Sequence, residues 1–170
     1  MPLFEPVFSA LNDAGVRYVV VGGLAVVLQG HLRMTADVDI VLDLEPSAAL
    51  RAMEALKKLG LKARAPVDPA AFADPSLRES WIVEKGMTVF SLFSPANPLL
   101  IVDLFAREPI PFEKLWARSK TIDLSGVPVR IASIDDLIEM KRAVARPQDL
   151  LDIEALEALK KRAPERKSDG

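Results

Sequence analysis

The chain has 170 residues, 50% of them hydrophobic and 27% charged, which are the proportions of an ordinary folded domain and exclude a disordered or fibrous protein. This length is typical of one domain, which we expect over 1–163, with a helical part over 131–163 and a disordered tail over 164–170. The chain has 22 Lys and Arg residues and 24 Asp and Glu residues. The resulting net charge of -2 argues against general electrostatic binding of nucleic acid.

Residue types that the chain lacks narrow the possible chemistry. Cysteine is absent, so disulfides, thiolate metal sites and cysteine nucleophiles are excluded, and the single histidine, His31, excludes a site with several histidine ligands. The longest apolar stretch, 18–28, is shorter than the about 20 residues that a membrane span requires. No basic residue precedes Arg17, so the positive start of a secretory signal is missing. We therefore expect a cytoplasmic protein without membrane contact.

The hydrophobic pattern of the first half predicts helices and strands in alternation. In chain order it predicts a helix over 3–15, a buried strand over 17–21, a turn at Gly22-Gly23, a short helix ending at Gly30, a strand over 33–43 and a helix over 46–59. Residues 66–78 are expected to be irregular, with one helical turn at 70–72. The strand over 33–43 alternates, so one face carries the apolar side chains of Met34, Ala36, Val38, Ile40 and Leu42. Its other face carries Arg33, Thr35, Asp37, Asp39 and Asp43.

The second half continues the mixture. The expected elements are strands over 80–84 and 88–93 joined by a hairpin at 85–87, a buried strand over 99–105, a short helix from Pro111, a hairpin around Ser125-Gly126, and helices that begin at Ser133 and Pro147. Ser133 and Asp136 resemble a capping box for a helix with an apolar stripe through Leu137, Met140 and Val144. The last helix carries its apolar stripe on Leu150, Ile153, Leu156 and Leu159, which we expect in the core.

Three carboxylates are the first candidates for chemistry. Asp37 and Asp39 are two residues apart on a strand, so their side chains project from the same face with Cα atoms about 6–7 Å apart. Asp103 interrupts an otherwise apolar strand, where an ionised carboxylate is costly unless it is paired, hydrogen-bonded or bound to metal. Three such carboxylates suit hard cations such as Mg²⁺, and two ions about 3.5–4 Å apart would suit displacement at phosphorus.

A glycine pair supplies a candidate phosphate site beside these carboxylates. Gly22 and Gly23 allow the backbone to approach a phosphate closely, and the helix that follows presents free N–H groups. Arg33 and Thr35 share the face of the carboxylates and could contact phosphate or an acceptor. The glycine-rich fingerprints of dinucleotide-binding and P-loop proteins are both absent from the sequence.

The segment VVVGGLAVVLQGHLRMTADVDIVL resembles the first motif of the nucleotidyltransferase superfamily, a glycine pair and a short helix followed by D-x-D. Within the superfamily, this motif and SIDDLIEMKRAVARPQDLLDIEAL are most similar to the AbiEii-type nucleotidyltransferase-like toxins and their small bacterial relatives. The resemblance implies a mixed α/β nucleotidyltransferase fold, in which a mixed sheet is flanked by helices and further helices follow at the C-terminus. It also implies Mg²⁺-dependent transfer of a nucleoside monophosphate from a nucleoside triphosphate to a hydroxyl.

The resemblance also implies roles for individual residues. Asp37, Asp39 and Asp103 would be the catalytic and metal-binding carboxylates, and Gly22 and Gly23 would bind the triphosphate. Arg33 and Thr35 would join them. From the C-terminal motif, Lys141 and Arg146 would face the nucleotide phosphates, and Asp149 would order the site. Gly23 departs from the Gly-Ser pair of many members, which removes a hydroxyl contact but keeps the backbone one.

Several alternatives stay open at the level of sequence. The chain could be an inactive member that binds a nucleotide or an antitoxin partner, or a metal-dependent nuclease that uses the same carboxylates. Asp37 and Asp39 could lie on a solvated strand face, and Asp103 could be paired with Arg33 or Lys141. Asp43 is more typical of a strand end or cap than of a ligand. The acceptor could be tRNA, a protein or a small molecule, and the base of the nucleotide is undetermined.

Overall fold

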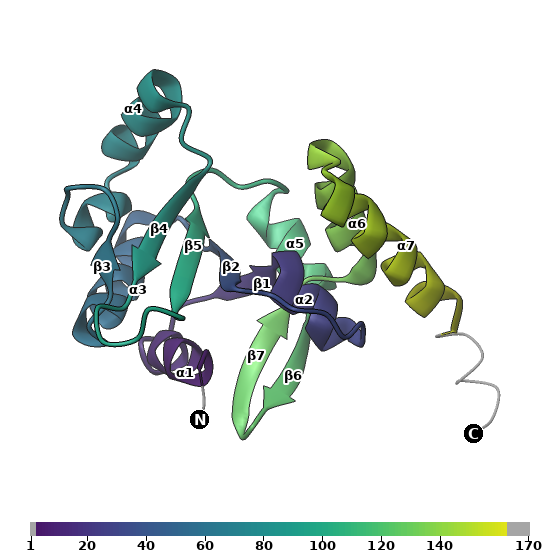
Figure 1. Cartoon of the computed structure of the whole chain (residues 1–170). Coiled ribbons are helices and arrows are strands. Elements are labelled where there is room, and N and C mark those ends of the chain that lie inside the picture. Colours follow the sequence, from purple (N-terminus) through teal and green to yellow (C-terminus); the bar gives the residue numbers. More distant parts are fainter. Residues whose placement is uncertain (1–2, 163–170) are drawn as a thin grey trace.

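A computed structural model describes residues 3–162, which form a seven-stranded mixed sheet with helices packed around it (Figure 1). The strand order is β3-β4-β5-β2-β1-β7-β6. The strands are β1 Tyr18–Val21, β2 Asp37–Leu42, β3 Lys62–Ala63, β4 Val89–Phe93, β5 Ile101–Phe105, β6 Lys120–Leu124 and β7 Val127–Ile131. The pairs β2–β5 and β1–β7 are parallel, and the other neighbouring pairs are antiparallel. The predicted mixed α/β fold is therefore confirmed.

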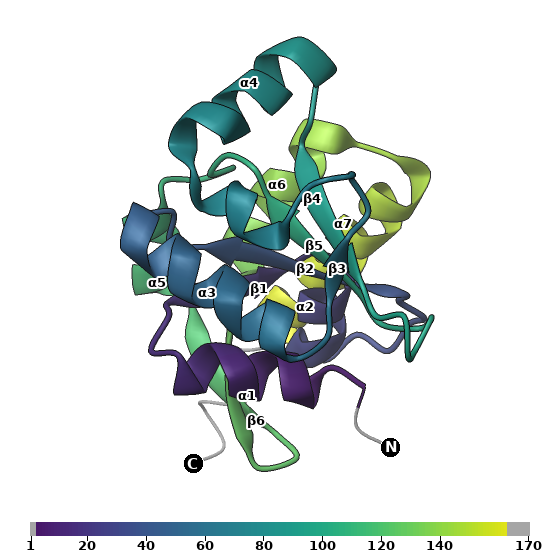
Figure 2. The ribbon, with the colours of Figure 1, turned by 90° about the vertical axis from the view of Figure 1, so that its left-hand side faces the viewer.

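Helices lie on both sides of this sheet. They are α1 Glu5–Asp13, α2 Gly22–Gln29, α3 Pro46–Lys58, the 3-10 turn η1 Pro69–Ala73, α4 Pro75–Lys85, α5 Phe112–Arg118, α6 Ile134–Val144 and α7 Pro147–Arg162. In Figure 2, α1 and α3 lie on the side of the sheet away from α6 and α7. The helix α2 packs against both α6 and α7. Among residues 3–162, no helix is long and apolar enough to cross a membrane.

Most of the predicted elements are confirmed. The glycine turn leads from β1 directly into α2, which ends at Gly30 as predicted. The hairpin around Ser125-Gly126 forms from β6 and β7, and the expected helical turn at 70–72 lies within η1. The hydroxyl of Ser133 accepts a hydrogen bond from the Asp136 backbone N–H at 3.1 Å, so the predicted cap begins α6. The tail predicted over 164–170 lies outside the described residues.

The strand predicted over 80–84 is wrong, because these residues belong to α4. The carboxylate of Asp74 accepts hydrogen bonds from the backbone N–H groups of residues 76 and 77, which begins the helix, and Pro75 occupies its first turn. Gly86 ends the helix in the left-handed conformation. The ring of Trp81 stacks on Phe90 of β4 with 5.4 Å between ring centroids. The β-branched and aromatic residues at 81–83 favoured a strand, but the caps and this packing select a helix.

The strand predicted over 33–43 is shorter than expected, since β2 begins only at Asp37. Val38, Ile40 and Leu42 are buried as predicted, whereas Met34 is 92% exposed on the loop that precedes the strand. Residues before Asp37 have no described strand beside them to pair with, because β5 begins opposite Asp37, at Ile101. Arg33 and Thr35 therefore lie on the loop between α2 and β2 rather than on a strand face.

The apolar stripes predicted for the last two helices are partly wrong. Leu137, Ile153 and Leu156 are buried as expected, and Met140 and Leu159 are only half-buried. Val144 and Leu150 are 59% and 55% exposed. Several positions of these two helices that face the interior are occupied by charged side chains. The buried polar set of these helices is Asp136, Lys141, Asp149 and Asp152.

Candidate active site

A row of four residues crosses four neighbouring strands and forms the centre of the candidate site. The strand register places Ser91 of β4 opposite Asp103 of β5, Asp103 opposite Asp39 of β2, and Asp39 opposite Val21 of β1. Neighbouring strands lie about 4.8 Å apart, so the Asp39 and Asp103 side chains leave the sheet side by side. Asp37 lies two residues before Asp39 on β2, so its side chain is on the same face of the strand. The three carboxylates predicted from sequence are thus brought to one region.

The strand β1 ends at this row, and α2 begins with Gly22 beside Asp39. Gly22 has a φ of 65°, a left-handed conformation that L-residues rarely adopt. A Cβ on Gly22 would lie 2.1 Å from Oδ2 of Asp39. The absence of a side chain therefore lets the carboxylate lie directly against the start of the helix.

Gly23 makes a second close approach at the start of α2. A Cβ on Gly23 would lie 2.6 Å from Nη2 of Arg33 and 2.8 Å from Oγ1 of Thr35. The loop that carries Arg33 and Thr35 thus folds back over the first turn of the helix. The side chains of Arg33 and Thr35 therefore lie beside the glycine pair, as expected from the sequence, although they come from a loop and not from a strand.

The C-terminal helices bring further cations to this region through buried ion pairs. Nζ of Lys141 lies 2.8 Å from Oδ2 of Asp152 and 3.4 Å from Oδ1 of Asp149. Nε of Arg146 donates to Oδ2 of Asp149 at 3.0 Å, and its backbone N–H donates to the same oxygen at 3.1 Å. Nη2 of Arg33 donates to Asp152 at 2.9 Å. This network joins the loop before β2 to both C-terminal helices.

The negative charges of Asp37, Asp39 and Asp103 are not fully compensated by neighbouring cations. Burial, with a smaller contribution from the Asp103 carboxylate, raises the pKa of Asp39 to about 7. Lys141 and Arg146 act in the opposite direction on the Asp39 pKa, which places both cations within its electrostatic reach. Burial and Asp103 also raise the pKa of Asp37. Such mutual repulsion is what a bound cation relieves.

The donor set fits Mg²⁺ in its chemistry, because it offers only carboxylate oxygens and carries an excess of negative charge. Asp37, Asp39 and Asp103 are the residues that would hold the metal. Within the described chain, no three Asp, Glu or His side chains are arranged closely enough to hold an ion as they stand. Oδ1 of Asp103 is engaged at 2.5 Å by the hydroxyl of Ser91, which donates to it. The donors are therefore gathered in one region without being preformed around a point.

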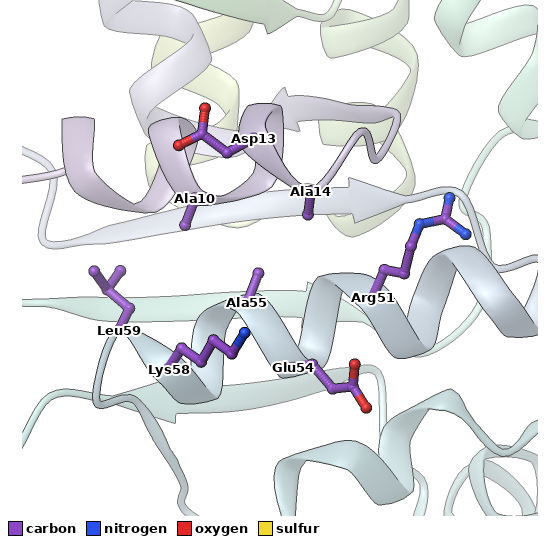
Figure 3. A pocket seen from close by; sticks show the side chains of 8 residues that line it. All are labelled: Ala10, Asp13, Ala14, Arg51, Glu54, Ala55, Lys58 and Leu59. Carbon is purple, nitrogen blue, oxygen red and sulfur yellow. The ribbon is translucent and has the colours of Figure 1, made fainter.

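Two other sequence candidates lie outside this cluster. Oδ2 of Asp43 pairs with Arg17 at 2.9 Å, and its Oδ1 accepts from the backbone N–H of Glu45 at 3.1 Å. Asp43 is therefore a strand-end residue, as its position suggested. His31 lines a hollow between the end of α2 and the outer side of α7 rather than the carboxylate row. Another hollow, between α1 and α3, is lined by alanines and by charged residues such as Arg51 and Glu54, and none of the predicted site residues borders it (Figure 3).

Sequence reasoning missed three residues that the structure places at the site. Asp152 is fully buried and pairs with two cations, and Ser91 binds Asp103. Arg64 lowers the pKa of Asp37 from the side of β3. The alternation of β4 places Ser91 on the face opposite the buried Phe90 and Leu92, which was a signal for a polar group beside Asp103. Nothing in the local pattern marks Asp152 or Arg64.

The family model described as a nucleotidyltransferase of unknown function (DUF6036) matches residues 7–163, which include the carboxylate row and both C-terminal helices. The chain belongs to this family. It is therefore identified as a member of a nucleotidyltransferase family, as the glycine pair and D-x-D motif indicated. No curated protein matches the sequence significantly.

Solved structures share the nucleotidyltransferase fold. The antibiotic-resistance factor ANT(2'')-Ia matches with a TM-score of 0.58 and 14% identity, over 98% of this chain and 92% of its own. The lincosamide antibiotic adenylyltransferase LnuA, solved with lincomycin, matches with a TM-score of 0.57 and 15% identity, over 89% of this chain and 92% of its own. An antigenic nucleotidyltransferase-like protein from Paracoccidioides brasiliensis matches with a TM-score of 0.59 and 17% identity, over 91% of this chain and 73% of its own. At these identities the likeness extends to the fold alone, and it does not single out the AbiEii-type group.

Proposed function

We propose that this nucleotidyltransferase-family chain moves a nucleoside monophosphate from a nucleoside triphosphate to an acceptor hydroxyl with the help of Mg²⁺. The observation that carries the proposal is the register of Asp39 against Asp103, directly beside Gly22 at the start of α2. Carboxylates for a hard cation and backbone N–H groups for phosphate thus occur within one site.

The chain offers separate groups for the two ends of the substrate. The first turn of α2 has no side-chain cap, so its N–H groups are suited to bind phosphate oxygens. Lys141, Arg146 and Arg33 add positive charge on the same side. Asp37, Asp39 and Asp103 would hold the metal. Mg²⁺, when bound, would neutralise the phosphate and carboxylate charges and lower the pKa of the acceptor hydroxyl.

The proposed reaction forms one bond and breaks one. The acceptor oxygen bonds to the α-phosphorus as the bond from that phosphorus to the pyrophosphate oxygen breaks. The acceptor proton passes to Oδ2 of Asp103, since Oδ1 is held by Ser91. Lys141 and Arg146 stabilise the charge that accumulates on pyrophosphate.

The inactive alternative is weakened by the surroundings of Gly23. Without a serine at this position the chain lacks one hydroxyl of the glycine motif. Oγ1 of Thr35 and Nη2 of Arg33 lie within 3 Å of the place that a Cβ of residue 23 would take. Polar groups from the loop therefore stand where the missing hydroxyl would contribute.

A small molecule is the acceptor class to test first. The neighbours of like fold include a lincosamide antibiotic adenylyltransferase bound to lincomycin and ANT(2'')-Ia in complex with adenylyl-2''-tobramycin. A tRNA pool and a protein extract are the other acceptor classes, and a stable complex with an antitoxin-like protein would add a regulatory role to the same fold.

The test is transfer of label from each α-labelled nucleoside triphosphate to members of the three acceptor classes, with and without Mg²⁺. Asp39→Asn is expected to fold and to lose transfer. Asp43→Asn is the matched control, because it removes a nearby carboxylate that pairs with Arg17 and should retain transfer. Equal transfer by wild type and Asp39→Asn would contradict the proposal. Metal-dependent binding without transfer to any class would favour the inactive alternative.

A further inference from the structure

Asp152 is the most deeply buried charged residue of the described chain, and the proposed reaction does not use it. Its side chain has no exposed surface. Oδ2 accepts from Nη2 of Arg33 at 2.9 Å and lies 2.8 Å from Nζ of Lys141, while Oδ1 accepts from Nε2 of Gln148 at 2.9 Å. A buried carboxylate persists only where it is paired in this way, so both cations are tied to it.

The two cations held by Asp152 point to different parts of the site. Arg33 comes from the loop before β2, and its Nη2 lies against the Cα of Gly23 in the first turn of α2. Lys141 comes from α6 and acts on the charge of Asp39. One oxygen of one residue therefore fixes the distance between a cation at the helix start and a cation beside the carboxylates.

The charge in this network exceeds what its own pairs need. Two buried carboxylates, Asp149 and Asp152, face three cations, namely Arg33, Lys141 and Arg146. Nε of Arg33 is buried and has no hydrogen-bond partner among the described residues. Arg146 keeps 74% of its side chain exposed. Arg33 lies at the start of α2, and Arg146 acts on the charge of Asp39, so both cations are available to an anionic ligand bound there.

We infer that Asp152 is a positioning residue that holds Arg33 and Lys141 in register with the first turn of α2 for the triphosphate of the nucleotide. This inference rests on the proposed function. The inference also explains why residue 23 is a glycine, because a side chain at this position would displace Arg33, which Asp152 holds. Asp152 itself contacts no substrate and acts through the two cations.

The first experiment measures binding of nucleotides by calorimetry in Mg²⁺. The four triphosphates are titrated into wild type, and the tightest is carried forward with its monophosphate. Asp152→Asn keeps the shape of the side chain and removes its charge, so we expect the triphosphate to bind about ten- to a hundredfold more weakly and the monophosphate to change little. Asp136→Asn is the matched control, since this aspartate is equally buried and pairs with Arg118 outside the network. It should leave both affinities unchanged.

A second readout needs no nucleotide. Lys141 is 9% exposed, and acetic anhydride should label it far more slowly than Lys57, which is 54% exposed in the same chain. Peptide mass spectrometry is expected to show that Asp152→Asn raises Lys141 labelling several-fold relative to Lys57, and that Asp136→Asn does not. If Asp152→Asn fails to fold, Gln148→Ala replaces it, because that change removes the hydrogen bond to Oδ1 from the exposed side. Gln148→Ala should have smaller effects of the same sign.

A double-mutant cycle links Asp152 to Gly23. Gly23→Ala alone should weaken triphosphate binding by displacing Arg33, and in the Asp152→Asn background it should add little, because the arginine is already released. Triphosphate affinity and Lys141 protection that both survive in Asp152→Asn would overturn the inference, and so would lost protection with unchanged triphosphate affinity. A wild type that binds no triphosphate would defeat the proposed function, while the labelling would still decide whether Asp152 positions Lys141.

Discussion

The α-carbon of Gly22 lies against the carboxylate of Asp39, so closely that a Cβ on residue 22 would come within 2.1 Å of Oδ2. Sequence reasoning explains this glycine by the approach of a phosphate. The structure adds that the glycine makes room for the central carboxylate. Both requirements act on the same residue, which joins the phosphate site to the metal-binding side chains.

Gly22→Ala is expected to destabilise the fold for two reasons that a control can separate. Gly15 has a similar φ of 67° but nothing within 4 Å of its missing Cβ, so Gly15→Ala should cost only the backbone strain, about 1–2 kcal/mol. Gly22→Ala should cost about 1–3 kcal/mol more because it also collides with Asp39. Urea unfolding measures both. Equal losses would show that the contact with Asp39 is unimportant. Asp39→Ala should reduce the difference, because it removes the carboxylate and leaves only the Cβ of residue 39, which would lie 2.9 Å from the added Cβ.

Stability should depend on pH through Asp39. Its pKa is raised from 3.8 to about 7 in the folded state, so the unfolded chain releases this proton at lower pH than the folded chain does. The carboxylate therefore costs stability progressively as the pH rises from about 4 to about 7. At about 1.4 kcal/mol per unit of pKa shift, Asp39→Asn should be more stable than wild type by up to about 4 kcal/mol at pH 8 and by little at pH 4. Thermal unfolding of both proteins across this range checks the sign, and a gap that grows toward low pH would refute it.

Mg²⁺ should offset the same cost. At pH 8 the metal is expected to raise the melting temperature of wild type by binding the folded state, and to leave Asp39→Asn unchanged. Na⁺ at matched ionic strength serves as the control for screening. An equal rise in both proteins would place the bound metal elsewhere.

Ser91→Ala should lower turnover without weakening nucleotide binding. Its hydroxyl holds Oδ1 of Asp103, and without it the proposed proton acceptor is free to rotate. We expect kcat to fall about tenfold while KM for the triphosphate stays within twofold. Ser80→Ala, which removes an exposed hydroxyl bonded only within α4, should change neither constant. A raised KM with unchanged kcat would assign Ser91 to substrate binding.

The helix α4 supplies a test of the fold itself. Asp74→Ala removes the carboxylate that accepts two backbone N–H groups at the start of α4 and should cost about 1 kcal/mol. Glu84→Ala, exposed on the same helix, should stay within about 0.5 kcal/mol of wild type. Chemical denaturation distinguishes the two. Similar stabilities would argue that Asp74 caps nothing.

Local patterns in the sequence predicted the carboxylates and the glycine pair, because strand alternation and glycine chemistry act over a few residues. Asp37 and Asp39 share a face for this reason alone. The pairing of Asp39 with Asp103 depends on the order of strands far apart in the chain, and no local pattern contains it. The family resemblance supplied that juxtaposition, and the register now describes it.

Errors arose where tertiary packing outweighed a local preference. The sequence around Trp81 favours a strand, but Asp74 and Gly86 cap a helix, and the indole stacks on Phe90. Asp152 looks like an ordinary solvated charge on a helix. Only the packing of α6 against α7, together with the return of the Arg33 loop, reveals it as a buried partner of two cations.

The most direct test of the central claim is calorimetric titration of the four nucleoside triphosphates, with and without Mg²⁺, into wild type and the Asp37→Ala/Asp39→Ala double variant. The proposal predicts that wild type binds at least one triphosphate only with the metal, and that the folded double variant does not. Absence of binding to wild type, or equal binding to the double variant, would contradict a nucleotide site built on these carboxylates.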